Sequence, residues 1–237
     1  MKVLIAIAII LAGILSVTAQ TAASQPADNT LARELAKAAL EAHGGRKLSE
    51  LKSMTIAGSV DVNVFNQVLP GTFAMVFEGE KYRIDLNNAA QPLKQVFDGT
   101  QTFTQIPNSF KLPPLDRVGF YVLRKVGDPS YPISMLPASA KGKSGFRITA
   151  PDGHFTDFYV DEKTKQIKGF DSAFEFFGQK GTTSVVIDKF RTADGVIIPE
   201  RFSQRFDLGQ ITAYCDFKAK DIRVNTEIAP DVFEIPK

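Results

Sequence analysis

The stretch that decides the fold is residues 182–217, TTSVVIDKFRTADGVIIPERFSQRFDLGQITAYCDF. Asp194-Gly195 and Leu208-Gly209-Gln210 separate three runs in which apolar and polar residues alternate. Asp-Gly between apolar runs is a strong signal for a tight hairpin turn. A period of two is typical of a strand with one face on a core and the other in water. The stretch therefore predicts three successive antiparallel strands.

The alternation also assigns side chains to the two faces of these strands. In the first strand it places Val186 and Phe190 on one face and Val185 and Ile187 on the other. In the next two strands one face carries Phe202, Phe206, Ile211, Ala213, Cys215 and Phe217. No catalytic constellation lies on the stretch, so the function depends on what this apolar face covers.

Residues 1–19 have the pattern of a secretory signal peptide. A basic start precedes the apolar run 3–15, and residues 17–19, VTA, fit a small-residue cleavage site. The run is too short for a membrane-spanning helix; an uncleaved anchor is the alternative interpretation. The only cysteine is Cys215, so the lipobox cysteine of a bacterial lipoprotein is missing from the cleavage point. We expect a soluble periplasmic protein whose residues 20–28 form a disordered leader.

The composition excludes several classes of protein. The 28 basic and 26 acidic residues nearly cancel and form no basic run, which argues against nucleic acid as a partner. A single cysteine excludes an internal disulfide, so stability must come from the core. The chain has 19 Phe and no Trp, a bias that indicates much apolar surface to line. We expect one domain, residues 29–237, in a monomer.

The rest of the chain predicts one helix and more short strands. Apolar residues recur at helical spacing from Leu31 to Ala42 (Leu31, Leu35, Ala38, Ala39, Ala42), and Gly44-Gly45 stops the helix. Strands with tight turns are predicted over 54–64, 71–78, 81–86, 93–97, 101–106, 146–149, 155–160, 167–170 and 174–177. Short strands joined by tight turns favour an antiparallel sheet over βαβ units. The last residues are expected to dock a final strand and Phe233 on the body.

Residues 107–145 interrupt this pattern and predict a helical lid inserted in the sheet protein. Their six prolines exclude a central strand. Pro114 opens a predicted helix over 115–126, and residues 131–136 are expected to add a short turn. The apolar stripe of the helix carries the lid candidates Leu115, Val118, Phe120, Val122 and Leu123. An ordinary packing helix is equally compatible with the stripe.

The search for catalytic chemistry is mostly negative. His43 and His154 are the only histidines, and neither has a partner at metal-ligand spacing. The sequence lacks a Gly-x-Ser-x-Gly elbow and a glycine-rich phosphate loop. Asp98, Asp161 and Asp194 lie in predicted hairpin turns, where aspartate is common because its side chain hydrogen-bonds to the nearby backbone. We therefore expect no catalytic residue, no metal and no cofactor, although strands can bring distant carboxylates together.

Several motifs resemble the LolA-like periplasmic lipoprotein carriers. The early ones are residues 69–73, LPGTF, with Glu78 and residues 82–85, YRID. Further matches are residues 97–103, 160–164, 194–199 and the ending 224–236. The resemblance spans nearly the whole mature chain. It implies a mainly β fold with α-helices: a curved antiparallel half-barrel sheet whose concave apolar face is covered by helices and holds acyl chains.

The resemblance also carries expectations about partners and one departure. It implies an inner-membrane transporter and an outer-membrane acceptor as partners of a carrier of lipoproteins or another envelope lipid. In the carriers an arginine just before the equivalent proline holds the lid, but Leu69 stands there in this chain. Arg83 and Arg117 are the candidates to replace it.

A curved sheet with many Phe on its concave face would present a cavity for acyl chains, which gain about 0.8 kcal/mol per buried methylene. The candidate lining residues are Phe73, Met75, Phe77, Phe97, Phe103, Phe176, Phe190, Phe202, Phe206 and Phe217. For each one alone, ordinary core packing is the competing interpretation. Two other functions stay open: a non-catalytic envelope-assembly scaffold with a filled core, and a hydrolase with converging carboxylates.

Overall fold

A computed structural model describes residues 26–65, 67–89, 92–105, 111–140, 142–176, 179–209 and 211–235. The expected signal peptide lies outside these residues. Helix α1 spans Pro26–Ala42 and therefore begins inside the leader that we expected over 20–28. A short helix, α2, follows at Arg46–Ser49.

The strands of the described part form a single antiparallel sheet of twelve. They are β1 Ser53–Val64, β2 Gln67–Glu78, β3 Lys81–Asn88, β4 Leu93–Phe97, β5 Thr102–Thr104, β6 Ile133–Met135, β7 Gly145–Thr149, β8 Phe155–Val160, β9 Ile167–Phe176, β10 Gln179–Ala193, β11 Val196–Leu208 and β12 Ile211–Val224. Their order is β5-β4-β3-β2-β1-β12-β11-β10-β9-β8-β7-β6. The first and last strands of the chain thus pair at the centre, and β5 and β6 stand at the two edges.

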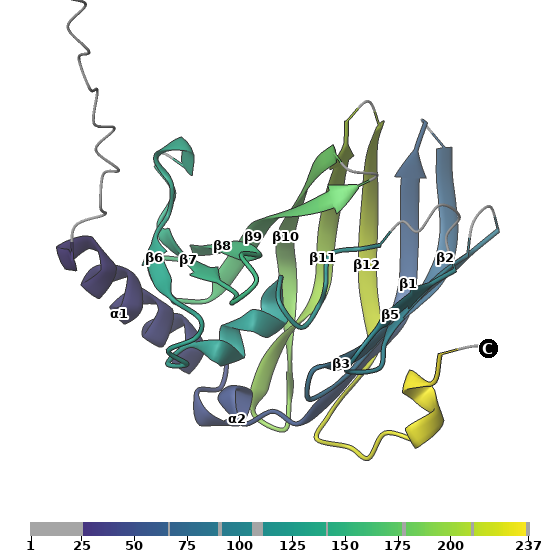
Figure 1. Ribbon diagram of the computed structural model, residues 1–237, viewed down its shortest axis with the longest axis horizontal. Helices are drawn as coiled ribbons and strands as arrows, with labels where there is room; N and C mark the ends of the chain where they lie inside the picture. Colours follow the sequence, from purple (N-terminus) through teal and green to yellow (C-terminus); the bar gives the residue numbers. More distant parts are fainter. Residues whose placement is uncertain are drawn as a thin grey trace, which may run out of the picture.

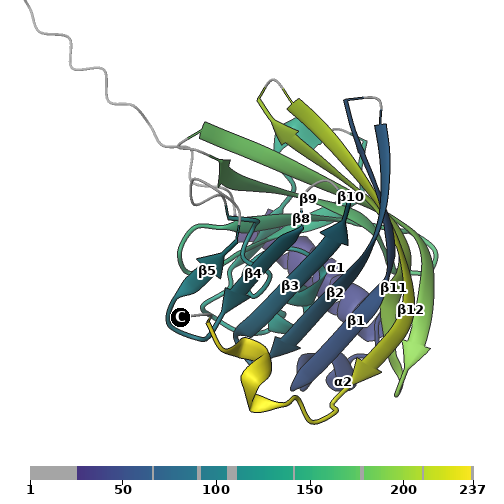
Figure 2. The ribbon, with the colours of Figure 1, turned by 90° about the vertical axis from the view of Figure 1, so that its right-hand side faces the viewer.

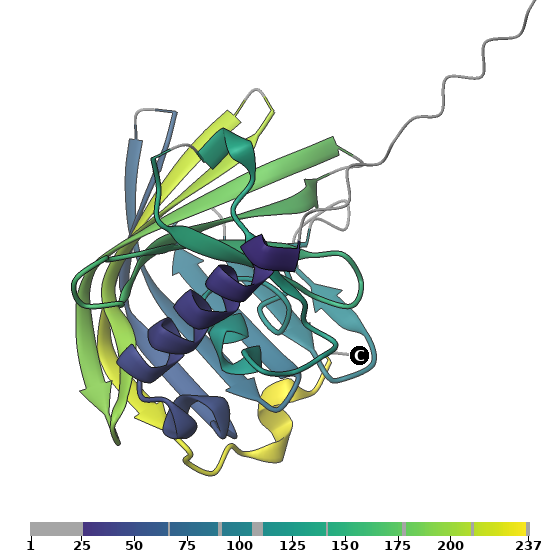
Figure 3. The same cartoon turned by 90° about the vertical axis from the view of Figure 1, so that its left-hand side faces the viewer.

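The sheet is strongly curved and open. Figure 1 and Figure 3 show α1, α2 and the segment between β5 and β6 on its concave side, while Figure 2 looks onto the convex side. Helix α1 packs on β6 and β7, close to one edge. The predicted mainly β half-barrel with helices over its concave face is confirmed.

The three predicted strands of residues 182–217 are confirmed as β10, β11 and β12. Asp194 and Gly195 both have positive φ, 46° and 78°, as a tight hairpin turn of this kind requires. One detail of the alternation is wrong. The alternation placed Val186 and Phe190 on one face, but Val186 is 59% exposed whereas Phe190 packs against the core. The register shifts between Ile187 and Phe190, and such a bulge moves the following side chains to the other face.

The predicted helix before Gly44 is confirmed, but its buried face differs slightly from the expected one. Leu31 is 59% exposed, and the fully buried side chains are Ala32, Ala36 and Ala39. Small side chains let the helix lie close to β6 and β7. The alanines therefore form the buried face of the helix, and the larger Leu31 lies outside it.

The helical insert forms less helix than predicted. Residues 115–119 form turns and a bend, and only Phe120–Lys125 form a 3-10 helix, η2. Gly119, with φ 86°, stands immediately before η2, a backbone conformation that cannot continue an α-helix. Residues 131–136, predicted as a turn, contain the edge strand β6. A further 3-10 turn, η3, spans Ala138–Ala140.

Two smaller expectations also change. The strands predicted over 167–170 and 174–177 are one continuous strand, β9. The final strand expected near the end of the chain is a 3-10 helix, η4, at Pro230–Phe233. Phe233 is 4% exposed, so the expected docking of that ring is confirmed.

Candidate functional site

The concave face encloses a cavity beneath residues 112–125, which we name the covering segment. The hollow has a volume of about 110 Å³ and is partly open to solvent. Ligand pockets are commonly ~300–1,000 Å³. An apolar cavity of ~150 Å³ is known to take a benzene-sized group. The hollow is therefore too small for a long chain unless the covering segment moves.

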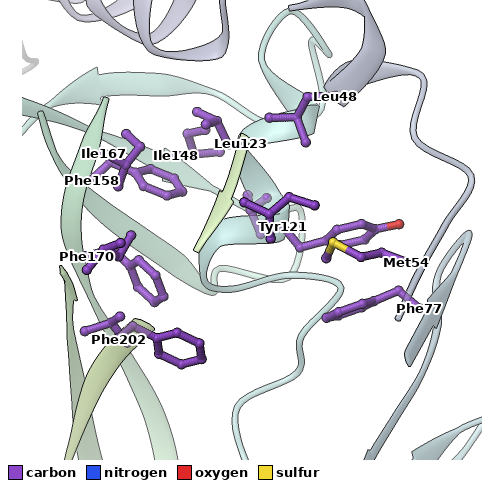
Figure 4. Close-up of a cluster of buried hydrophobic side chains, with 14 of the residues drawn as sticks. Leu48, Met54, Phe77, Tyr121, Leu123, Ile148, Phe158, Ile167, Phe170 and Phe202 are labelled. Atoms are coloured by element: carbon purple, nitrogen blue, oxygen red, sulfur yellow. The ribbon is translucent and has the colours of Figure 1, made fainter. Parts of the chain in front are cut away.

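Three parts of the chain border the cavity. Strands β1, β2 and β3 contribute Met54, Ile56, Met75, Phe77, Ile84 and Leu86. Strands β9 to β12 contribute Phe170, Ser172, Thr183, Val185, Pro199, Phe202, Gln204, Phe206 and Phe217. The covering segment contributes Leu112, Pro113, Leu115, Val118, Gly119, Phe120 and Tyr121. Figure 4 shows Phe170 and Phe202 on one wall, and Met54 and Phe77 on the other with Tyr121 beside them.

Half of the ten predicted lining residues border this cavity: Met75, Phe77, Phe202, Phe206 and Phe217. They come from strands on both sides of the central β1–β12 pair, as the repeated alternation in the sequence indicated. Met and Phe side chains suit a site whose occupant varies in shape, because Met in particular adapts its conformation.

Of the other predicted lining residues, Phe73, Phe97 and Phe190 belong to the core away from this cavity. Phe73 packs edge-on behind Phe217, with ring centroids 5.0 Å apart. Phe97 lies beside Tyr82, and Phe103 pairs with Val96 near the edge of the sheet. Phe190 packs against His43, with centroids 5.1 Å apart. Phe176 lies in β9, but its side chain is outside the described part.

The predicted lid residues divide into two groups. Leu115, Val118 and Phe120 border the cavity. Val122 and Leu123 are completely buried, and the η2 helix that carries them contacts α2. Leu123 and Leu48 lie close together in Figure 4. Val122 and Leu123 therefore anchor the covering segment in the core, whereas Leu115, Val118 and Phe120 face the cavity.

Hydrogen bonds from the sheet hold the covering segment at both ends. The Gln95 side chain accepts from Leu112 N–H at 2.7 Å and donates to Leu112 O at 3.2 Å. Gly119 N–H donates to Thr156 Oγ1 at 3.0 Å. Arg124 donates to Gly79 O at 2.8 Å. These bonds join the segment to strands on opposite sides of the cavity.

Of the two candidate lid-holding arginines, Arg117 lies in the covering segment. It donates to Asp152 Oδ2 at 2.5 Å and to Asp116 Oδ2 at 3.0 Å. Asp152 belongs to the turn between β7 and β8, so this ion pair ties the segment to that turn. Burial raises the pKa of Asp116, and the neighbouring Arg117 opposes that shift. Arg83 instead pairs with Asp85 at 2.6 Å and donates to the backbone at η4.

The two histidines have structural partners. His43 is completely buried; its Nδ1–H donates to Ile197 O at 2.8 Å, and its Nε2 accepts from Ile167 N–H at 2.9 Å. This pattern requires a neutral ring, and burial lowers the pKa of His43. His154 lies 3.0 Å from Asp152 through its Nδ1. Neither histidine borders the cavity.

Charged groups are absent from the cavity walls formed by the described residues. Within the same residues, no group of three or more His, Cys, Asp or Glu side chains could hold a metal ion. Cys215 is 4% exposed, and burial raises the pKa of its thiol to about 12. The walls therefore offer apolar contact and a few neutral hydrogen-bonding groups.

Sequence reasoning missed several wall residues, including Tyr121, Phe170, Ser172, Thr183 and Gln204. Phe170 had a usable signal, because a spacing of two residues places it on the same face of a strand as Phe174. The polar residues had none, since a Ser, Thr or Gln in a strand normally predicts the face in water.

Among the described residues, no helix has the length and apolar character needed to span a membrane. No family model matches the sequence, and no curated protein is significantly similar to it.

Solved structures share the fold at low sequence identity. A DUF1329 family protein from Desulfovibrio piger is 9% identical with a TM-score of 0.51, over 86% of this chain and 97% of that one. A LolA superfamily protein from Nitrosomonas europaea is 11% identical with a TM-score of 0.52, again over 86% of this chain and 97% of that one. The chain thus has a LolA-like fold.

Proposed function

We propose that this chain with a LolA-like fold is a soluble periplasmic carrier that binds acyl chains of a lipoprotein or another envelope lipid. The observation that carries the proposal is the apolar hollow between the two halves of the curved sheet, roofed by a segment that only its ends and a few side chains hold. The role needs no catalysis. An inner-membrane transporter and an outer-membrane acceptor would load and unload it.

Burial of hydrocarbon supplies the binding free energy in this proposal. Each methylene removed from water contributes about 0.8 kcal/mol, so roughly eight methylenes contribute about 6 kcal/mol before the cost of ordering the chain. The side chains of Phe77, Phe202 and Phe217 border the hollow and carry no charge that would need a partner. This suits a ligand that must also be released.

The covering segment must move to admit a long chain, because the hollow is only about 110 Å³. Its polar attachments, at Gln95, Arg117 and Gly119, can break and reform while Val122 and Leu123 stay buried. The proposal is therefore that residues 112–119 swing outward about the buried η2 helix.

The two other functions fit the cavity less well. A hydrolase needs a nucleophile with a base, or converging carboxylates; the hydroxyls of Ser172 and Thr183 border the cavity without Asp, Glu, His, Lys or Cys beside them on the described walls. A scaffold would have a filled core, whereas the hollow here costs packing energy.

Organic extraction of the purified protein, followed by mass spectrometry, tests the proposal. We expect acyl lipids at a substantial molar ratio to protein. A delipidated sample should then bind a hydrophobic dye that lauroylglycerol displaces. Protein that carries no lipid and binds neither the dye nor lauroylglycerol would refute the carrier function.

A further inference from the structure

One wall of the apolar cavity carries a row of neutral polar side chains. We name Thr156, Ser172, Thr183 and Gln204 the polar strip; they come from β8, β9, β10 and β11, four adjacent strands. Ser172 lies directly opposite Thr156 on one side and Thr183 on the other. The strip therefore crosses the wall perpendicular to the strands, with Ser172, Thr183 and Gln204 bordering the hollow.

The strip lies in surroundings that are otherwise apolar. Thr156 is completely buried, and Ser172 and Thr183 are each 2% exposed. Phe170 and Phe174 flank Ser172 along β9, and Val185 follows Thr183 on the same face of β10. A hydroxyl buried this way costs free energy unless it finds a partner, so the positions call for a reason beyond packing.

The end of the strip on β8 and β9 is hydrogen-bonded to the covering segment. Thr156 Oγ1 accepts from Gly119 N–H at 3.0 Å and faces Ser172 Oγ at 3.4 Å. The two hydroxyls at this end are therefore engaged within the protein. Their role is to fix the segment over the cavity.

At the other end, on β10 and β11, Thr183 and Gln204 have hydrogen-bonding groups that are not used within the described part of the protein. Gln204 Nε2 donates one N–H to Thr183 Oγ1 at 2.9 Å. The second N–H and the carbonyl oxygen of Gln204 have no partner among the described residues, and the Thr183 O–H is not used in that bond. Both groups border the cavity. Two residues with an unused donor thus lie side by side on the wall of an apolar hollow.

We infer that Gln204 and Thr183 bind the carbonyl oxygen of an ester- or amide-linked acyl chain whose hydrocarbon lies against Phe202, Phe206 and Phe170. The inference rests on the proposed carrier function and names its ligand class. A carbonyl fits because it accepts hydrogen bonds and is neutral. A free carboxylate or a phosphate at this depth would need a cation, and the described walls hold none.

A matched pair of lipids tests the inference on the delipidated full mature chain. 1-Lauroylglycerol and 1-O-dodecylglycerol have the same chain length and headgroup, and differ at the ester carbonyl that the ether lacks. Their affinities are measured by displacement of a bound hydrophobic dye. We expect the ester to bind about tenfold more tightly, the order of a well-made buried hydrogen bond, and laurate to bind more weakly than the ester.

Substitutions then assign the preference to the strip. Thr183→Val keeps the shape of the side chain, and Gln204→Leu changes a half-buried position that tolerates an apolar residue. Each should reduce the ester-over-ether ratio severalfold. Thr182→Val is the matched control, because Thr182 is the adjacent residue on the opposite, exposed face of β10.

The outcomes separate this inference from the carrier function. Equal affinity for ester and ether in the wild type would overturn the inference alone, as would a preference that survives in both Thr183→Val and Gln204→Leu. Tighter binding of laurate than of the ester would also overturn it. Failure of both the ester and the ether to bind would overturn the carrier function along with it.

Discussion

The ring of Tyr121 in the covering segment stacks on the ring of Phe77 in β2, with centroids 4.6 Å apart and planes inclined by 18°. The hydroxyl of Tyr121 donates to Gly79 O at 3.1 Å in the turn after β2. One side chain thus joins the segment to the sheet through both an aromatic face and a hydrogen bond. Since both rings border the cavity, this contact closes its β2 side.

The opposite side is closed by Arg117, and its loss should speed exchange of the ligand. Arg117→Ala removes the ion pair with Asp152. The same change leaves the buried carboxylate of Asp116 without its cation, so the stability cost should be about 1–3 kcal/mol. Release of a bound hydrophobic dye, followed by stopped-flow fluorescence, should become up to about fivefold faster.

Arg83→Ala is the control, because Arg83 pairs with Asp85 and η4 and lies outside the covering segment. Its dye release rate should match wild type. If both variants release dye at the wild-type rate, Arg117 does not hold the segment closed.

A charge inside the cavity should abolish most binding. Phe206→Asp replaces a half-buried ring of the wall, and we expect the dissociation constant for the dye to rise at least about tenfold. Val186→Asp places the same charge on a side chain that is 59% exposed, and its affinity should be unchanged. Equal affinities of the two variants in a fluorescence titration would contradict the placement of the ligand.

Leu123 should anchor the covering segment in the core. Leu123→Ala leaves a cavity at a completely buried site and should lower the free energy of unfolding by about 2–5 kcal/mol. Leu115→Ala, at a half-buried site that faces empty space, should cost clearly less. Urea unfolding followed by circular dichroism makes the comparison, and similar costs would show that Leu123 is no anchor.

Folding stability should fall in mild acid because of His43. Its folded pKa lies below the value of about 6.5 for an unfolded chain. Between these two values the unfolded chain binds more protons, so the contribution of His43 is complete above about pH 6.5 and is lost as the pH falls through the folded pKa. Protonation would also remove the acceptor for Ile167 N–H.

Urea midpoints of wild type and His43→Asn between pH 4 and 8 test this linkage. The variant should be less stable at pH 7, and its stability should change less with pH over this range. Parallel pH profiles of the two proteins would show that another group causes the acid loss.

The sequence was most informative where alternation is uninterrupted. The hairpin at Asp194-Gly195 and the strands around it followed from turn chemistry and a period of two. The bulge between Ile187 and Phe190 was beyond that reasoning, because an inserted residue changes the face of all that follow without leaving a sign in the pattern. Phe190 and Val186 were therefore wrongly assigned to the same face.

The cavity was harder to predict than the sheet. A Phe that borders a hollow, such as Phe202, and one that fills the core behind it, such as Phe73, have the same sequence signal. Their difference arises from sheet curvature and from the path of the covering segment, where Gly119 replaces a regular helix by turns. The sequence pattern did not predict the polar strip, because Ser172 and Thr183 are polar residues on the covered face, where the alternation predicts apolar side chains.

The methionine methyl groups offer the most direct measurement of the central claim. Met54 and Met75 border the cavity, while Met135 is 37% exposed on the edge strand β6. In methyl-labelled, delipidated protein titrated with lauroylglycerol, the signals of Met54 and Met75 should shift and saturate together while that of Met135 stays in place. Unchanged Met54 and Met75 signals at lipid saturation would contradict an acyl chain in this cavity.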